Sequence, residues 1–141
     1  MAANILYVRV DGDDQKAEIG NPLRPYTLPG ALNYVNSLTN GGLSFIEIGI
    51  GSFNLECPNV ALISNDVVIT GTGSKSTILN VYRFNINNSA TVTMQSLSIR
   101  SCRSDFLFTL NTGILNLFNS EVMVNSGALF SNEDGSLLAN G

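Results

Sequence analysis

An internal repeat of 22 to 23 residues in the second half of the chain most constrains its fold. Two sets of equivalent positions define the repeat. At an offset of 23, Val92, Met94, Leu97 and Ile99 match Leu115, Leu117, Ser120 and Val122. At an offset of 22, Phe84 and Ile86 match Phe106 and Phe108. Each repeat contains two or three short alternating segments separated by Asn, Gly and Ser. This pattern predicts a β-solenoid, in which each repeat forms one coil and each strand pairs with its equivalents in the next coils.

A β-sandwich or jelly roll is the alternative to a solenoid. Such folds depend on hairpins, for which Asn-Gly or Asp-Gly between two alternating runs is the strongest signal. Here such a pair lies between two alternating runs only in "TNGG" and "EDGS", near the two extremes of the repeat region. The stretch "FIEIGIGSFNL", residues 45–55, alternates throughout and is predicted to be a single strand.

The N-terminal part of the chain differs from the repeats. A strand is predicted over Ile5 to Val10, followed by a long ordered loop rich in Asp, Gly and Pro. Next comes one amphipathic helix, with Thr27 as N-cap and Gly41 as its stop. Its apolar positions follow helical spacing: Leu28, Ala31, Leu32, Val35 and Leu38. The loop segment "DGDD" lacks the later Gly and Glu of a calcium-binding EF-hand, so we expect a turn in which Asp side chains bind local backbone.

The composition of the 141-residue chain indicates one globular domain and excludes several classes of function. Charged residues make up 13% of the chain and the net charge is -4, without a basic cluster, so nucleic-acid binding is disfavoured. No window reaches 18 apolar residues, and the start lacks the basic and apolar regions of a signal peptide. We therefore expect synthesis in the cytoplasm and no membrane partner. The chain has no His, which argues against a zinc site, and no cofactor or metal is expected.

Several motifs along the chain, taken together, resemble one known family. In order they are "YVRVDGDD", "GNPLRPYTLPGAL", "FIEIGIGSF", "VVITGTG" and "STIL". This series resembles the right-handed parallel β-helix proteins with a pectin-lyase-like fold. The resemblance implies an all-β fold, a right-handed single-stranded parallel β-helix of about four to five coils with a short N-terminal capping helix. Residues 1–42 would form the strand, loop and cap, and residues 43–141 the coils of the same domain.

The solenoid prediction also bears on Cys57 and Cys102. They lie 45 residues apart, about two coils, so equivalent positions would be roughly 9 to 10 Å apart. Because a disulfide tolerates Cα separations only to about 7 Å, we expect two free thiols.

Relatives with this fold include polysaccharide lyases and hydrolases, so an enzymatic function must be weighed. Hydrolases of the fold typically carry Asn-Thr-Asp, Asp-Asp and Gly-His-Gly motifs on successive coils, and none of the three occurs in the predicted coils, residues 43–141. A lyase needs a basic residue beside a calcium-binding carboxylate, and the best such group is Arg100, Arg103 and Asp105. A solvated corner explains these three residues equally well. We therefore assign no catalytic, cofactor-binding or metal-binding residues.

Carbohydrate binding without catalysis is a further alternative. Sugars stack on exposed aromatic rings, and the chain offers these candidates: Tyr7, Tyr26, Tyr34 and Tyr82. The phenylalanines near the inward positions of the repeat are expected in the core: Phe84, Phe106, Phe108, Phe118 and Phe130. An ice-binding solenoid is disfavoured because the chain lacks regular rows of Thr.

The ends of the predicted solenoid suggest a structural role. The helix is expected to cap the N-terminal end, whereas the last coil, ending in "GSLLANG", carries no comparable cap. An open solenoid end exposes strand edges that invite association, so either the chain is a fragment or a partner covers this coil. We expect a non-catalytic structural or attachment component of a virus or phage particle, located in the virion. Its partners would be other subunits of the assembly, including copies in a homotrimer as in tailspikes, or a surface glycan.

Overall fold

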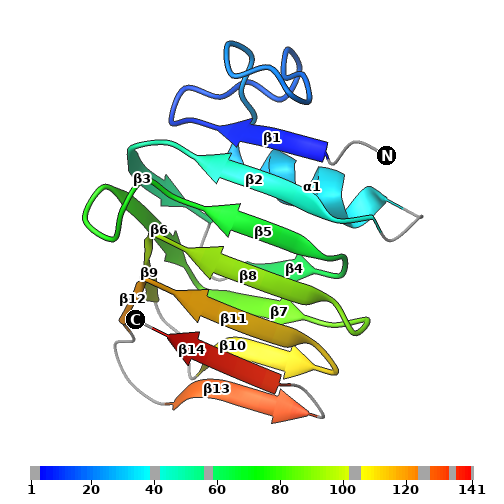
Figure 1. Cartoon of the computed structure of the whole chain (residues 1–141), viewed down its shortest axis with the longest axis vertical. Coiled ribbons are helices and arrows are strands. Elements are labelled where there is room, and N and C mark those ends of the chain that lie inside the picture. Colours follow the sequence, from blue (N-terminus) through cyan, green and yellow to red (C-terminus); the bar gives the residue numbers. More distant parts are fainter. Residues whose placement is uncertain are drawn as a thin grey trace.

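The computed structural model describes residues 4–38, 42–55, 59–101, 106–123, 128–133 and 136–140. These residues form a parallel β-solenoid of about three turns with one short helix near the N-terminus (Figure 1). All paired strands run parallel, so the strands follow one another around the solenoid rather than folding back as hairpins. The predicted solenoid is confirmed and the sandwich alternative is wrong.

The strands build three sheets, which we name A, B and C. Sheet A has the order β1 (Asn4–Val8), β2 (Ser44–Ile48), β5 (Val67–Thr70), β8 (Thr91–Gln95), β11 (Ile114–Phe118) and β14 (Ser136–Asn140). Sheet B contains β3 (Gly51–Asn54), β6 (Thr77–Val81), β9 (Ser98–Ser101) and β12 (Glu121–Met123). Sheet C contains β4 (Val60–Ile63), β7 (Arg83–Ile86), β10 (Phe106–Asn111) and β13 (Ala128–Glu133).

Columns of buried apolar side chains form the core. Because successive residues of a strand point to opposite faces, every second residue of each strand faces the interior. In sheet A, paired strands place these residues in one column: Leu6, Ile46, Ile69, Met94 and Leu117, of which the first four are 0 to 1% exposed and the last 6%. Sheet B contributes Phe53, Leu79, Ile99 and the half-buried Val122.

The offset of 23 predicted from sequence is the observed register between β8 and β11 in sheet A and between β9 and β12 in sheet B. Val92 pairs with Leu115, and Ile99 pairs with Val122. The offset of 22 predicted for sheet C is wrong, because Phe84 pairs with Phe108 rather than with Phe106. A shift of two residues keeps every side chain on the same face of the strand, so the apolar pattern alone cannot distinguish the two registers.

The corners between strands repeat with the same spacing. Ser96 and Asn119, each between a sheet A and a sheet B strand, have φ angles of 60° and 48°. Ser89 and Thr112, which precede β8 and β11, have φ angles of 56° and 60°. A corner also divides the segment predicted as one strand over residues 45–55, since β2 ends at Ile48 and β3 begins at Gly51. This turn interrupts the chain where the alternating pattern alone predicted one continuous strand.

The single described helix, α1 (Leu28–Ser37), lies at the N-terminal end of the solenoid and packs on β1, β2 and β4 (Figure 1). Its buried residues are four of the five predicted from helical spacing, Leu28, Ala31, Leu32 and Val35, whereas the fifth, Leu38, is half-buried and follows the helix. Thr27 caps it as expected, and the helix ends at the C-cap Leu38, before the predicted stop at Gly41, which lies outside the described residues. Among the described residues, no helix is long and apolar enough to cross a membrane.

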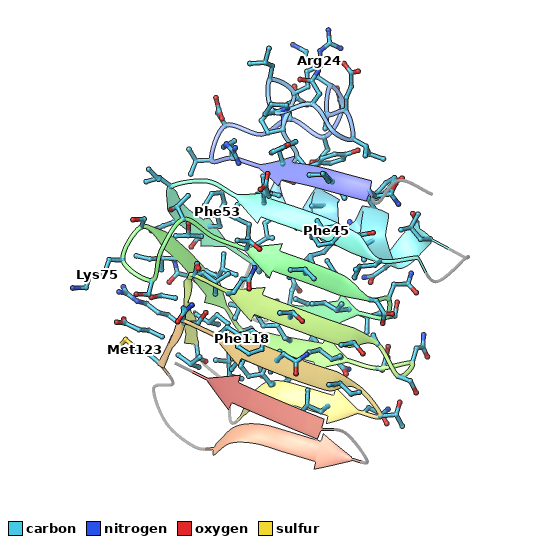
Figure 2. The ribbon with its side chains drawn as sticks, viewed as in Figure 1. Arg24, Phe45, Phe53, Lys75, Phe118 and Met123 are labelled. Carbon is cyan, nitrogen blue, oxygen red and sulfur yellow. The ribbon has the colours of Figure 1, made fainter. Side chains whose placement is uncertain are left out.

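The outer faces of the sheets carry mixed side chains. Figure 2 shows Phe45 and Phe118 on sheet A, and Lys75 and Met123 projecting near one corner of the solenoid. Phe118 pairs with Gln95 on the outer face and is half-buried, so the prediction that it belongs to the core is wrong. The reason is parity, because its neighbour Leu117 takes the inward position.

Candidate functional site

The residues considered for lyase chemistry are only partly described. Arg100 lies on β9, exposed on the outer face of sheet B, where its register partners are Asn80 and Met123. Arg103 and Asp105 lie outside the described residues, as do both cysteines. That Arg100, Arg103 and Asp105 cluster in space therefore stays a prediction.

The described acidic groups of the solenoid lie apart from one another. Glu47 is exposed on the outer face of β2, and Glu121 is exposed on β12. The Asp66 carboxylate accepts a hydrogen bond from the backbone N–H of Thr91 at 2.8 Å, which ties the start of β8 to the preceding coil. Among the residues that the structure describes, no three Asp, Glu, Cys or His side chains gather where they could hold a metal ion.

The four tyrosines considered for sugar stacking do not form one platform. Tyr26 and Tyr34 face each other with ring centroids 6.3 Å apart. The Arg9 guanidinium lies 5.7 Å from the Tyr7 ring, and a similar contact joins Arg83 and Tyr82. Burial raises the pKa of Tyr26, with smaller contributions in the same direction from Tyr34 and the Asp14 carboxylate. These rings act as parts of the N-terminal packing and of local cation contacts.

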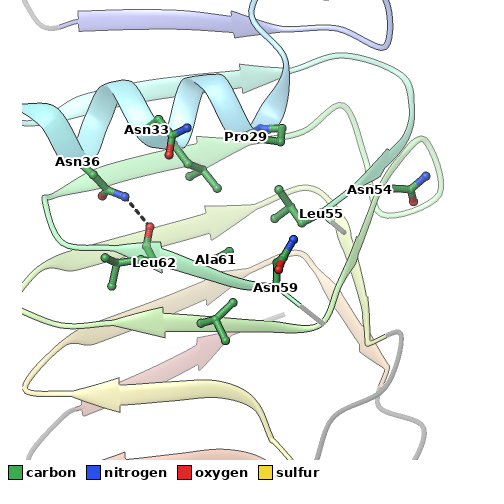
Figure 3. A pocket seen from close by; sticks show the side chains of 10 residues that line it. Pro29, Asn33, Asn36, Asn54, Leu55, Asn59, Ala61 and Leu62 are labelled. Atoms are coloured by element: carbon green, nitrogen blue, oxygen red, sulfur yellow. Dashed lines mark hydrogen bonds between the residues drawn. The ribbon is translucent and has the colours of Figure 1, made fainter. Parts of the chain in front are cut away.

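A groove lies between α1 and the edge of sheet C (Figure 3). We call it the α1–β4 groove; it has a volume of about 600 Å³. Its lining is Pro29, Leu32, Asn33, Asn36, Asn54, Leu55, Asn59, Val60, Ala61 and Leu62. None of these side chains is charged, and four of them are Asn. The groove therefore offers amide donors and acceptors beside apolar surface.

The N-terminal loop fixes the helix that forms one wall of this groove. The Thr27 side chain accepts a hydrogen bond from Gly30 N at 3.1 Å, as an N-cap residue does. The Asp14 carboxylate in turn accepts from the Thr27 backbone N–H at 2.8 Å and from its hydroxyl at 2.7 Å. Asp13 accepts from Gln15 N at 3.0 Å, which is the local backbone bonding expected for "DGDD".

Asn36 connects the helix to the edge of β4. Its amide Nδ2 donates to Leu62 O at 2.7 Å (Figure 3), and its Oδ1 accepts from Ser64 N at 3.0 Å. A residue of a parallel neighbouring strand would make the same pair of bonds, to the carbonyl before and the N–H after its partner. The Asn36 side chain thus stands in for one residue of a strand that sheet C does not have at this edge.

A second, smaller groove continues along the same end of the molecule. It has a volume of about 280 Å³ and lies over β3, lined by Arg9, Val10, Thr27, Leu28, Pro29, Ser52, Phe53 and Asn54. Pro29 and Asn54 line both grooves. The two grooves together therefore form one interrupted furrow that runs along the N-terminal edges of sheets B and C.

Comparisons with known proteins identify no relative. No protein-family model matches the chain, and neither the curated proteins nor the solved structures include a match. The fold is therefore established by the strand register alone, and any function must be argued from the grooves and edges of this molecule.

Sequence reasoning did not find the α1–β4 groove. The available signal was the spacing of Asn33 and Asn36, which lie three residues apart on one side of the amphipathic helix. The partners of Asn36 lie 26 and 28 residues further along the chain. Helical spacing could predict that these amides share a face, but not which strand edge that face would meet.

Proposed function

We propose that this chain is a non-catalytic structural or attachment module, a rigid solenoid that docks on partner subunits of a large assembly such as a virus or phage particle. The observation that carries this proposal is the furrow along the N-terminal edges of sheets B and C, where open strand edges meet a partly apolar wall that is uncharged in the α1–β4 groove. An open edge with apolar surroundings is a surface suited to another polypeptide. The described carboxylates contribute structural bonds or lie singly on outer faces.

The finer architecture belongs to the same proposal. We expect a right-handed solenoid, because connections between parallel strands of one sheet are right-handed in about 98% of cases. We expect about four to five coils, because a strand from each sheet recurs in the order A, B, C from β2 to β13 and β14 returns to sheet A.

Light scattering tests the docking function on the isolated chain. A docking module whose partners include copies of itself has a mass that is a multiple of 15.1 kDa, a trimer in the tailspike-like case, at micromolar concentration. A second measurement tests the absence of catalysis. The chain is incubated with polygalacturonate and with neutral glycans, and new reducing ends or unsaturated products are measured. Turnover would contradict the proposal, and so would a monomer that binds no protein partner.

Glycan binding is the second candidate, favoured by the four Asn side chains of the α1–β4 groove. Amides can pair with sugar hydroxyls as donors and as acceptors. The four tyrosines do not line this groove, so an aromatic platform would have to lie elsewhere. Titration with a neutral oligosaccharide such as cellotetraose distinguishes this candidate from docking of a polypeptide.

A further inference from the structure

At the N-terminal end of the solenoid, sheet A has one more strand than sheets B and C. Among the described strands, sheet A has β1 in front of β2, whereas sheet B begins with β3 and sheet C with β4. Helix α1 lies beside β4 where a further strand of sheet C would run (Figure 1). A helix cannot supply the regular row of peptide groups that a strand supplies, so the β4 edge needs other partners.

The peptide groups of β4 alternate between its two neighbours. Ile63 faces β7, since its carbonyl accepts from Asn87 N at 3.1 Å. In a parallel strand the N–H and C=O of one residue point to the same side, and the next residue points to the other. Val60 and Leu62 therefore direct their backbone groups toward α1. Asn36 already binds Leu62 O, which leaves Val60 O and Leu62 N as the next pair in the same pattern.

This next pair opens into the α1–β4 groove. Val60 and Leu62 both line it and are 45% and 42% exposed. A peptide residue placed opposite Ala61 would donate to Val60 O and accept from Leu62 N, repeating what the Asn36 amide does two residues further on. Since Asn36 already occupies the position opposite Ile63, the remaining part of β4, Val60 to Leu62, matches an added segment of about three residues.

The lining of the groove indicates the chemistry of that segment. A side chain opposite Ala61 would point inward, as Ala61 does, and meet Leu32 and Leu55, so an apolar residue fits there. Its neighbours in the segment would point outward, beside the exposed Asn33 and Asn59. A charged segment is disfavoured, because no lining side chain could pair with its charge after desolvation.

We propose that the α1–β4 groove binds an extended, uncharged peptide segment of a partner subunit, of the pattern polar–apolar–polar, which adds to sheet C as a short parallel strand on β4. This inference rests on the proposed docking function and names the partner chemistry at one docking surface. A peptide fits the observations better than a sugar, because the free groups at this edge have the spacing of a β ladder.

The probe is a synthetic peptide with the sequence of residues 84–90, "FNINNSA". With an acetylated N-terminus and an amidated C-terminus it is uncharged, it contains the pattern Asn-Ile-Asn, and its first three residues are those of β7 that pair in parallel with the other edge of β4. The matched control peptide carries an N-methyl group on its isoleucine. This change keeps every side chain and removes the N–H that would donate to Val60 O.

The matched protein variants are Asn33→Tyr and Ser37→Tyr. Both residues are exposed on α1, but Asn33 lines the groove and Ser37 does not. Circular dichroism confirms that each variant folds. In a fluorescence anisotropy titration we expect saturable binding of the probe to the original chain and to Ser37→Tyr. Binding should weaken at least about tenfold for Asn33→Tyr and for the N-methylated peptide, which corresponds to the loss of about 1.4 kcal/mol.

Four outcomes would overturn the inference. They are no saturable binding at millimolar peptide, equal binding of the N-methylated peptide, equal binding by Asn33→Tyr, and saturable binding of cellotetraose without peptide binding. Light scattering and the glycan turnover assay are independent of this titration. A chain that assembles and lacks turnover but does not bind the peptide contradicts this inference alone, whereas glycan turnover contradicts the proposed function.

Discussion

The rings of Phe84 and Phe108 stack inside the solenoid with centroids 5.7 Å apart and an interplanar angle of 13°. The two residues are register partners on β7 and β10, and both are buried, at 1% and 0% exposure. Parallel in-register pairing places like side chains directly over one another, so the coil spacing itself produces the stack. The Phe84–Phe108 pair is thus the local consequence of the repeat.

Truncation of this stack should destabilise the whole solenoid. Phe108→Ala removes a fully buried ring, and we expect the free energy of unfolding to fall by about 3 to 5 kcal/mol. The control is Phe118→Ala on the half-buried outer face of β11, which should cost clearly less. Urea unfolding followed by circular dichroism measures both. Equal losses for the two variants would contradict the assignment of inward and outward rows.

Loss of the Asn36 amide should loosen the contact between α1 and β4. Asn36→Ala removes bonds to Leu62 O and Ser64 N, and we expect a loss of about 1 to 3 kcal/mol. Asn33→Ala, on the exposed groove side of the same helix, should stay within about 0.5 kcal/mol of the original chain. Hydrogen exchange of the Ser64 N–H should rise in Asn36→Ala only. Unchanged exchange in that variant would show that another group protects this edge.

A side chain at Gly71 should be poorly tolerated. A Cβ atom there would lie 2.4 Å from the Ser96 backbone O and 2.8 Å from the Thr77 Cβ, so two coils would have to move apart. We expect Gly71→Ala to cost about 1 to 3 kcal/mol. Gly42→Ala is the control, since a Cβ there meets nothing within 4 Å. The midpoints of urea unfolding should separate the two variants, and coincident midpoints would argue against close packing of the coils at this corner.

Alkaline pH should weaken the N-terminal packing through Tyr26. Burial raises the pKa of Tyr26 above the ordinary value of 10.0. The unfolded chain therefore releases this proton at lower pH than the folded protein, and the free energy of unfolding falls as the pH rises above about 10. At neutral pH, Tyr26 is protonated in both states and its stabilising contribution is fully present. Tyr26→Phe should reduce this alkaline decline, measured by urea unfolding at a series of pH values, and an unchanged decline would assign it to other groups.

The sequence predicted the solenoid because apolar side chains recur at the inward positions of successive coils. Val92 and Leu115 lie one coil apart with similar side chains, and their spacing is the observed register. The register of Phe84 could not be predicted in the same way, since Phe106 and Phe108 are both aromatic and have the same parity. Choosing between them requires the length of the intervening corners, which the apolar pattern does not encode.

The candidate site was less predictable than the fold. The helix wall followed from the N-cap Thr27 and the spacing of its apolar residues, both of which are confirmed. The groove itself depends on Asn36 reaching Leu62, a contact between an exposed helix face and an edge strand. Neither propensity nor periodicity relates those two positions, because their proximity arises only from the way α1 replaces a strand of sheet C.

Methyl contacts measured by nuclear magnetic resonance test the central claim, the parallel in-register solenoid, most directly. The account predicts nuclear Overhauser effects between the side chains of Ile46 and Ile69, Ile69 and Met94, and Met94 and Leu117, since these residues are successive register partners in one buried column. Cross-strand effects that pair these strands in opposite directions, as in a sandwich of antiparallel sheets, would contradict it.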